Sequence, residues 1–374
     1  MIDEYKGGAH TGHKLKDNKR FKIMNSLARI IILLLVLAVT AIAGPLRKEQ
    51  VAADAKWLVH LDVDKLRSTT VGGVIKQLVD AKTVALKAQF DLDLDWNKIS
   101  SLTAYGSAYQ SKPNFDGVVL IKTDLDLQKA LNGAMEKMSP EDGNAPAPIQ
   151  KTQQGEVTTY SLKQAMFVSF QPGKPVILSH SRDSLQKARE VLSGTAANLA
   201  STRTFSEFPE SKKAFFLTAA AEGFNFGHEF PEQAGGDDPA NPKAKILKLA
   251  EGGRVMLGEE ASQLFVDLSL KAKTSEVVTQ MQQVIQGMIA LASLSQVDNQ
   301  DLQQLAQSAK VFATGTVVSL QLGYPADKAI AMFNNHMNGP MGHKKRAQNG
   351  EMHRTKHRSR GAEEPKEPPK AEEN

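Results

Sequence analysis

A serine, a histidine and an aspartate, the residue types of a nucleophilic catalytic triad, stand together in the run Ser179-His180-Ser181-Arg182-Asp183. A triad is assembled from segments that are distant in the sequence, so adjacency of these types is not evidence for one. Serine and aspartate also cap helix N-termini most often, because their side-chain oxygens accept hydrogen bonds from unpaired backbone N–H groups. We therefore predict that this run ends a strand and that Asp183 caps a helix over residues 184–192.

Closely spaced aspartates could bind a metal or carry out acid–base catalysis. Asp62 and Asp64 form one pair, and Asp124 and Asp126 form another; each pair lies between an expected strand and an expected helix. A capping role for one aspartate of each pair, with Asp64 in the first case, explains these positions without a cofactor. The acidic run over residues 91–95 lacks the glycine and the distal glutamate of an EF-hand, so we expect a polar strand or loop there.

Histidines occur in two settings that resemble metal sites. His228-Glu229 begins like the helix of a zinc protease, but Pro231 follows and no second histidine stands at the required spacing. His353 and His357 lie four residues apart with His343 nearby, and they could share a metal only on a formed helix. The chain has no cysteine, which excludes a thiolate metal site and a cysteine nucleophile. The sequence therefore predicts no catalytic residue, no cofactor and no metal site.

Cations are concentrated near the C-terminus. Residues 343–360 contain seven lysines and arginines and one glutamate, whereas residues 44–339 carry 30 basic and 32 acidic side chains. The near-neutral body gives no support for specific nucleic-acid binding. The tail could hold an anionic polymer or a membrane surface by charge alone, or it could simply be a solvated segment that keeps the protein soluble. The candidate contacts to a polyanion are Lys344, Lys345, Arg346, Arg354, Lys356, Arg358 and Arg360.

The elements that position these residues alternate between strands and helices, with a capping residue at most junctions. Both halves of the body run β-α-β-β-α-β and then a further helix. This order predicts an α+β fold: two split-βαβ, ferredoxin-like halves, an internal duplication that could share one antiparallel sheet, with helices packed on one face. We expect strands over residues 57–63, 101–108, 117–122, 157–162, 165–170, 175–179, 213–220, 254–258, 263–272 and 311–322, and helices over 65–86, 125–138, 184–192, 243–250, 275–294, 302–308 and 326–336.

The segment over residues 24–44 has the layout of a secretory signal peptide. Arg29 precedes an apolar run over residues 30–39, and small residues follow at Ala41 and Ala43. We predict export to the periplasm or the extracellular space, with Met24 as the true start. The alternative is a retained anchor in the inner membrane formed by residues 28–46, which is near the minimum length of about 17 residues for a spanning helix.

The chain therefore divides into four predicted parts. Residues 1–43 form an N-terminal extension with the signal peptide or anchor, residues 52–200 the first α+β half, and residues 210–338 the second half. Residues 339–374 are basic and then acidic and proline-rich, with few apolar side chains to bury. Such a composition predicts a disordered tail.

Short motifs resemble those of a group of uncharacterised exported bacterial proteins. They are the opening AADAKWLVHLDVDKLRSTTVGGVI, the strand LTAYG at residues 102–106 and the strand GVVLI at residues 117–121. The resemblance implies an exported, duplicated α+β domain and brings no known activity, cofactor or catalytic residue.

Taken together, these features favour a non-enzymatic envelope protein that binds or scaffolds an unknown protein or envelope component. The first alternative is a secreted hydrolase with a site near the loop over residues 223–242, which is longer than ordinary connections. The second is tethering through the tail. A concave pocket with converging Asp, His or Ser side chains would favour an enzyme, whereas a flat or apolar sheet face would favour binding.

Overall fold

The computed structural model describes residues 45–90, 95–109, 117–138, 149–162, 166–210, 213–224, 242–295 and 300–338. The predicted signal peptide, all of the predicted anchor except residues 45 and 46, most of the 223–242 loop and the predicted disordered tail lie outside these residues. The chain forms two compact units, one ending at Ala326 and one beginning at Asp327. Among the helices of the described residues, none combines the length and the apolar character needed to cross a membrane.

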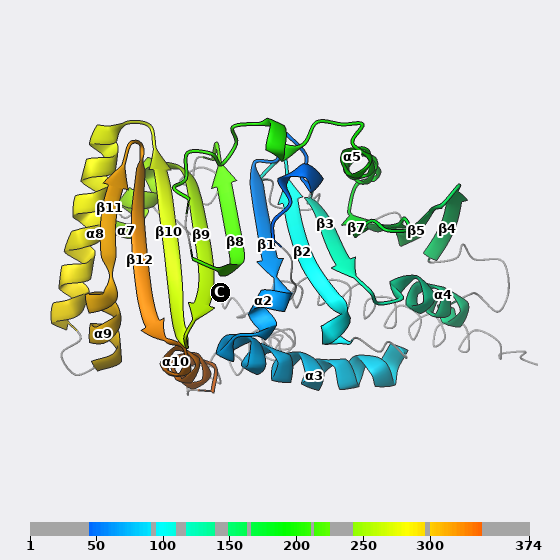
Figure 1. Ribbon diagram of the computed structural model, residues 1–374, viewed down its shortest axis with the longest axis horizontal. Helices are drawn as coiled ribbons and strands as arrows, with labels where there is room; N and C mark the ends of the chain where they lie inside the picture. Colours follow the sequence, from blue (N-terminus) through cyan, green and yellow to red (C-terminus); the bar gives the residue numbers. More distant parts are fainter. Residues whose placement is uncertain are drawn as a thin grey trace, which may run out of the picture. The chain divides into compact units, whose positions relative to one another are not determined.

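The first unit is built on one antiparallel sheet, which contains twelve strands in the described part of the chain (Figure 1). Their order from edge to edge is β11-β12-β10-β9-β8-β1-β2-β3-β7-β6-β5-β4. The strands are β1 (Trp57–Asp62), β2 (Ile99–Gly106), β3 (Gly117–Thr123), β4 (Ile149–Gln154), β5 (Val157–Leu162), β6 (Met166–Phe170), β7 (Val176–Ser179), β8 (Phe215–Glu222), β9 (Ala250–Glu260), β10 (Gln263–Ala272), β11 (Lys310–Thr314) and β12 (Val317–Pro325).

The helices connect these strands at the predicted places. They are α2 (Val63–Arg67), α3 (Thr70–Phe90), α4 (Leu127–Met138), α5 (Arg182–Ser193), α7 (Pro242–Leu249), α8 (Ser275–Ser295), α9 (Gln300–Ser308) and α10 (Ala326–Asn338), with short 3₁₀ turns η2 (Lys48–Gln50), η3 (Trp96–Lys98) and η4 (Leu199–Ser201). All of α10 after its first residue belongs to the second unit.

Successive strand residues point to opposite faces of a sheet, so the core divides into two layers. On one face, Leu61 packs with α2 and α3, Tyr160 with α4, and Leu270 with α7 and α8. We call this the helix face. The predicted α+β class, with an antiparallel sheet and helices packed on one face, is confirmed. In addition, α5 packs with η2 and η4 on the opposite face, against Leu58 and Tyr105.

The strand order inside each half differs from the predicted split-βαβ arrangement. β1 and β8, the first strands of the two halves, pair with each other at the middle of the sheet, followed outward by β2 and β3 on one side and β9 and β10 on the other. Each of these neighbours is antiparallel. Because the first two strands of each half pair directly, no other strand can insert between them as it does in a ferredoxin-like half.

Two local predictions also need correction. The strand expected over residues 311–322 is a hairpin, because Gly315 adopts a φ of +57° and reverses the chain between β11 and β12. The helix expected over residues 65–86 is two helices. Thr69 ends the first by donating to the Leu66 carbonyl at 2.6 Å and begins the second by accepting from Gly72 N at 2.9 Å. In addition, β4 forms where no strand is predicted.

Candidate functional site

One aspartate of each pair caps a helix. Asp62 Oδ1 accepts from Lys65 N at 2.8 Å, so Asp62 rather than the predicted Asp64 caps α2. The reason is that α2 begins at Val63, which places Asp64 in the first turn, where it forms an ion pair with Arg67. In the second pair, Asp126 Oδ1 accepts from Lys129 N at 2.8 Å at the start of α4.

The serine–histidine–aspartate run also builds local structure. Ser181 is the N-cap of α5 and accepts from Ser184 N at 3.3 Å, whereas the predicted cap, Asp183, lies within the first turn. Ser179 Oγ donates to Gly117 O at 3.3 Å and accepts from Ser181 N at 3.2 Å. Both hydroxyls are therefore engaged with backbone groups at the junction of β7 and α5.

The remaining candidates lie mostly outside the described residues. Asp95 accepts from Asn97 N at 2.9 Å and caps η3, but residues 91–94, His228, Glu229 and the three tail histidines are not described. Over the described ranges, no group of three or more histidine, aspartate or glutamate side chains could hold a metal ion. The seven tail cations, which remain predictions, are Lys344, Lys345, Arg346, Arg354, Lys356, Arg358 and Arg360.

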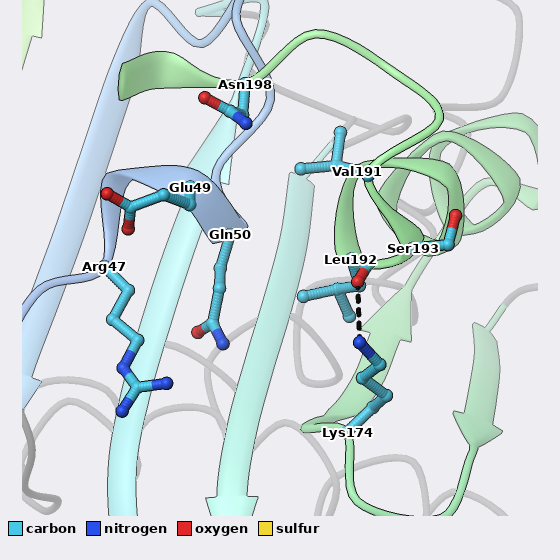
Figure 2. Close-up of a pocket in the computed structure, with 9 residues that line it drawn as sticks. Arg47, Glu49, Gln50, Lys174, Val191, Leu192, Ser193 and Asn198 are labelled. Carbon is cyan, nitrogen blue, oxygen red and sulfur yellow. Dashed lines mark hydrogen bonds between the residues drawn. The ribbon is translucent and has the colours of Figure 1, made fainter. Parts of the chain in front are cut away.

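A hollow of about 410 Å³ lies between η2 and the C-terminal end of α5 (Figure 2). Lys174 Nζ donates to Leu192 O at 3.0 Å and so satisfies a carbonyl at the end of the helix. Arg47 and Glu49 are exposed at the rim. The lining mixes exposed charges, amides, a serine, backbone and two apolar side chains. The lining residues are Arg47, Glu49, Gln50, Lys174, Val191, Leu192, Ser193, Gly194 and Asn198.

A different surface lies on the helix face, over β8, β9, β10 and β12. The strand registers align its side chains in two rows across the four strands, and every one is apolar and only partly buried. We call this the central apolar face. One row is Ala219, Val255, Leu268 and Leu320; the other is Leu217, Leu257, Val266 and Leu322.

The central apolar face lies between two packed clusters of the core. Leu217 and Leu257 contact the cluster formed with α2 and α3, and Leu268 contacts the cluster formed with α7 and α8. Val255 and Val266 stand between these contacts in the strand register. The face is therefore a continuous apolar surface that joins two parts of the core.

The same strands bury polar side chains on the opposite face. Asp267 is 6% exposed, Ser269 is 0% and Ser319 is 2% exposed, although their neighbours Val266, Leu268 and Leu320 are partly exposed. This burial is the reverse of what solvation favours, since leucine and valine gain from leaving water and aspartate does not. The apolar side is thus less covered than the polar side.

Hydrogen bonds compensate for the loss of solvation of the buried polar side chains on this face. Gln321 Nε2 donates to Asp267 Oδ2 at 3.0 Å, and the hydroxyls of Ser269 and Ser319 lie 3.0 Å apart. Arg254 donates to Pro209 O at 2.6 Å, with its guanidinium 5.4 Å from the Phe208 ring centre. Burial lowers the pKa of Arg254, although attraction to Asp267 opposes this shift.

Charged groups near the ends of the central apolar face form hydrogen bonds or ion pairs within the protein. The Glu259 carboxylate accepts from the first turn of α3. Near the end of β10, Lys273 Nζ lies 3.4 Å from Glu251 Oε1. The two rows themselves contain no charged or polar side chain. The surface therefore offers only apolar contacts and its shape.

Comparison with known proteins identifies no family. No family model matches the chain, and no curated protein matches it. The solved structures that are similar include three crystal forms of TP0453, a protein of the bacterium Treponema. Form III has 10% identity and a TM-score of 0.42 over 77% of this chain and 97% of that one. Forms IV and I have 9% and 11% identity, TM-scores of 0.44 and 0.41, and the same 78% and 97% coverage. Values this low support no inference about this chain.

Proposed function

We propose that this chain is a non-enzymatic, exported binding protein of the bacterial envelope, and that it holds an apolar partner against the central apolar face. The observation that carries this proposal is the reversed burial across β10. Val266 and Leu268 are partly exposed on one face, while Asp267 between them is buried on the other. A partner that covers the apolar rows would restore the usual distribution of polar and apolar groups.

The energetics favour such a partner. Removing apolar surface from water contributes roughly 25 cal/mol per Å², so covering several partly exposed leucines and valines gives a few kcal/mol before the costs of association. The backbone of these four strands is paired on both sides in the sheet. Covering this surface therefore requires no desolvation of unpaired strand backbone.

A neutral fluorescent probe, N-phenyl-1-naphthylamine, tests this surface. Val266→Thr keeps the size and β-preference of the side chain but adds a hydroxyl, so the probe should bind several-fold more weakly. The matched control is Val84→Thr on α3, where the valine is 71% exposed and lies outside the two rows. An equal loss of probe binding in Val266→Thr and Val84→Thr would contradict the proposal. Unchanged probe binding in a double variant that carries Val266→Thr and Val255→Thr would contradict it as well. Circular dichroism confirms that the variants are folded.

The envelope location is tested separately. An intact mass of the exported protein that lacks residues 24–43 supports a cleaved signal peptide, and a mass that retains them supports the anchor. Protein found only in the cytoplasmic fraction would contradict export. The two other proposals, a hydrolytic site near residues 223–242 and tethering through the tail, depend on residues outside those described.

A further inference from the structure

We infer that residues 202–210, which lead from η4 toward β8, form a strap that is closed over the polar side of the sheet at mildly acidic pH and opens as the pH rises. We call this segment the strap. Its two phenylalanines pack in the core cluster of α5, on the face opposite the central apolar face. The inference therefore goes beyond the proposed function and does not depend on it.

Side chains of the sheet hold the strap in place through its backbone. Glu222 Oε1, at the end of β8, accepts from Phe205 N at 2.9 Å. Arg254 of β9 donates to Pro209 O at 2.6 Å. The strap belongs to no strand of the sheet, so it can leave the surface without breaking a ladder of backbone hydrogen bonds.

The side chain of Glu207 is the third attachment of the strap. Its Oε1 accepts from Lys271 Nζ at 2.8 Å, and its Oε2 accepts from Thr316 Oγ1 at 3.2 Å. Lys271 is also attracted to Glu222. One ammonium group therefore serves two carboxylates, one on the strap and one on β8.

The closed strap contains a strained residue. Phe205 adopts a φ of +63° and is 7% exposed. Bulky L-residues rarely adopt this conformation, and such strain persists only where the surroundings enforce it. Here the hydrogen bond from Phe205 N to Glu222 and the packing of the Phe205 ring in the core enforce it. Weakening the hold of Glu222 therefore releases strain and favours opening.

Titration of Glu222 links the closed strap to pH. Burial raises the pKa of this carboxyl, and repulsion from Glu207 adds to the effect, whereas attraction to Lys271 and the hydrogen bond from Phe205 N oppose it. Because opening hydrates the carboxyl, the closed strap binds more protons than the open strap. Closure is therefore favoured below the ordinary pKa of 4.5 and is weakened as the pH rises through the raised value.

The neighbouring groups do not reverse this dependence. The hydrogen bond from Lys271 lowers the pKa of Glu207, so protonation of Glu207 weakens the strap only below 4.5. The pKa of Lys271 is raised from 10.5, so its charge persists at neutral pH. The charged and titratable groups around Glu222 are Glu207 on the strap, Lys271 on β10, Glu251 on β9, which acts on Lys271, and Lys56 and Tyr109, which bond to the Glu222 backbone.

Opening would uncover the buried polar side of β9, β10 and β12. Phe208 of the strap is 3% exposed, and its ring lies against the Arg254 guanidinium. Ser269 is next to Arg254 in the strand register, and Ser319 is next to Ser269; both serines are buried. The strap therefore controls the access of solvent to this polar row.

Amide hydrogen exchange of the full chain, measured by mass spectrometry from mildly acidic to neutral pH, tests the inference. Protection factors correct for the effect of pH on the intrinsic exchange rate, and peptides from β10 report global unfolding. We expect strap peptides to be less protected than β10 peptides, and their protection to fall several-fold as the pH rises. Glu222→Gln keeps an acceptor but cannot ionise, so it should remove this dependence. Glu260→Gln, an exposed carboxyl at the opposite end of β9, should leave it unchanged.

A second variant separates the pH dependence from the general hold on the strap. Thr316→Val removes one hydrogen bond to Glu207 and leaves Glu222 in place, so it should lower strap protection by a similar factor at every pH. Circular dichroism checks that the variants are folded. Strap protection that is constant with pH in the unmodified protein, or that falls equally in Glu222→Gln, would overturn the inference. Strap peptides as protected as those of β10 would also overturn it, because the strap would then open only on global unfolding.

Discussion

The Glu259 carboxylate accepts two hydrogen bonds from the N-terminus of α3, with Oε1 2.8 Å from Thr70 N and Oε2 3.1 Å from Val71 N. These residues are 189 and 188 positions apart in the chain. Unpaired N–H groups at a helix start favour a negative charge, and here the charge comes from β9 rather than from the preceding turn. The contact therefore joins the second half of the sheet to a helix of the first half.

Glu259→Ala should lower the free energy of unfolding by about 1–2 kcal/mol, since it removes both acceptors and the charge at the helix start. Glu259→Gln should cost less than Glu259→Ala, because it keeps one acceptor, although it loses the charge and the second acceptor. Urea denaturation followed by circular dichroism measures both. Glu260→Ala is the control, because this exposed side chain follows Glu259 on the same strand. A similar loss in the control would show that the contact does not stabilise the fold.

The cap of α2 distinguishes the two aspartates at its start. Asp62→Ala should destabilise the protein by about 1 kcal/mol, because it leaves Lys65 N without its side-chain acceptor. Asp64→Ala removes only an exposed ion pair with Arg67 and should cost about 0.5 kcal/mol or less. Chemical denaturation of both variants gives the comparison. An equal or larger loss for Asp64→Ala would show that the capping assignment is wrong.

The turn between β11 and β12 requires glycine. Gly315 has a φ of +57°, where a Cβ is disfavoured, so Gly315→Ala should cost about 1 kcal/mol. Gly323 is the matched control: it lies in β12, has no positive φ, and a Cβ there would meet no atom within 4 Å. Gly323→Ala should therefore be neutral or slightly stabilising. Thermal unfolding of Gly315→Ala and Gly323→Ala measures the two changes in stability. Equal losses of stability would contradict the turn assignment.

The partly buried carboxyl of Glu222 should make folding stability fall as the pH rises. Burial raises its pKa above 4.5, although attraction to Lys271 and a hydrogen bond from Phe205 N oppose the shift. A raised pKa means that the folded state binds more protons than the unfolded state, so stability falls as pH rises from 4.5 through the folded pKa. Glu222→Gln should flatten this part of the profile, as measured by urea denaturation from acidic to neutral pH.

Glu207 provides a control of opposite sign. The hydrogen bond from Lys271 Nζ, 2.8 Å long, lowers the pKa of this carboxyl below 4.5. Its contribution is therefore present above the unfolded pKa and lost as pH falls through the folded one. Glu207→Gln should reduce stability at neutral pH and leave most of the fall above 4.5 in place, because burial, and not the smaller effect of the Glu207 charge, is the main cause of the raised pKa of Glu222. If the two variants change the profile in the same direction, the assignment for Glu222 is wrong.

Much of the secondary structure could be predicted from local patterns. The strand over residues 263–272 is observed as Gln263–Ala272, and the helix over residues 275–294 as Ser275–Ser295. Each is long and strongly periodic, so the pattern is unambiguous. The sequence pattern did not predict the hairpin at Gly315, because apolar residues continue on both sides of the turn. β4 was hidden because five of its six side chains are exposed and most are polar.

The central apolar face could not be predicted in the same way. Alternation in β10 separates Val266 and Leu268 from Asp267 and Ser269, so it shows that the strand has two different sides. It contains no information about what covers each side. That depends on which strands become neighbours and where α3 and α8 pack, and these contacts join residues far apart in the chain. Local sequence was therefore enough to place most helices and strands, because these follow from neighbouring residues, but it placed the caps of α2 and α5 two residues too late. Only the tertiary structure shows that the polar side of β10 is buried and its apolar side is partly open.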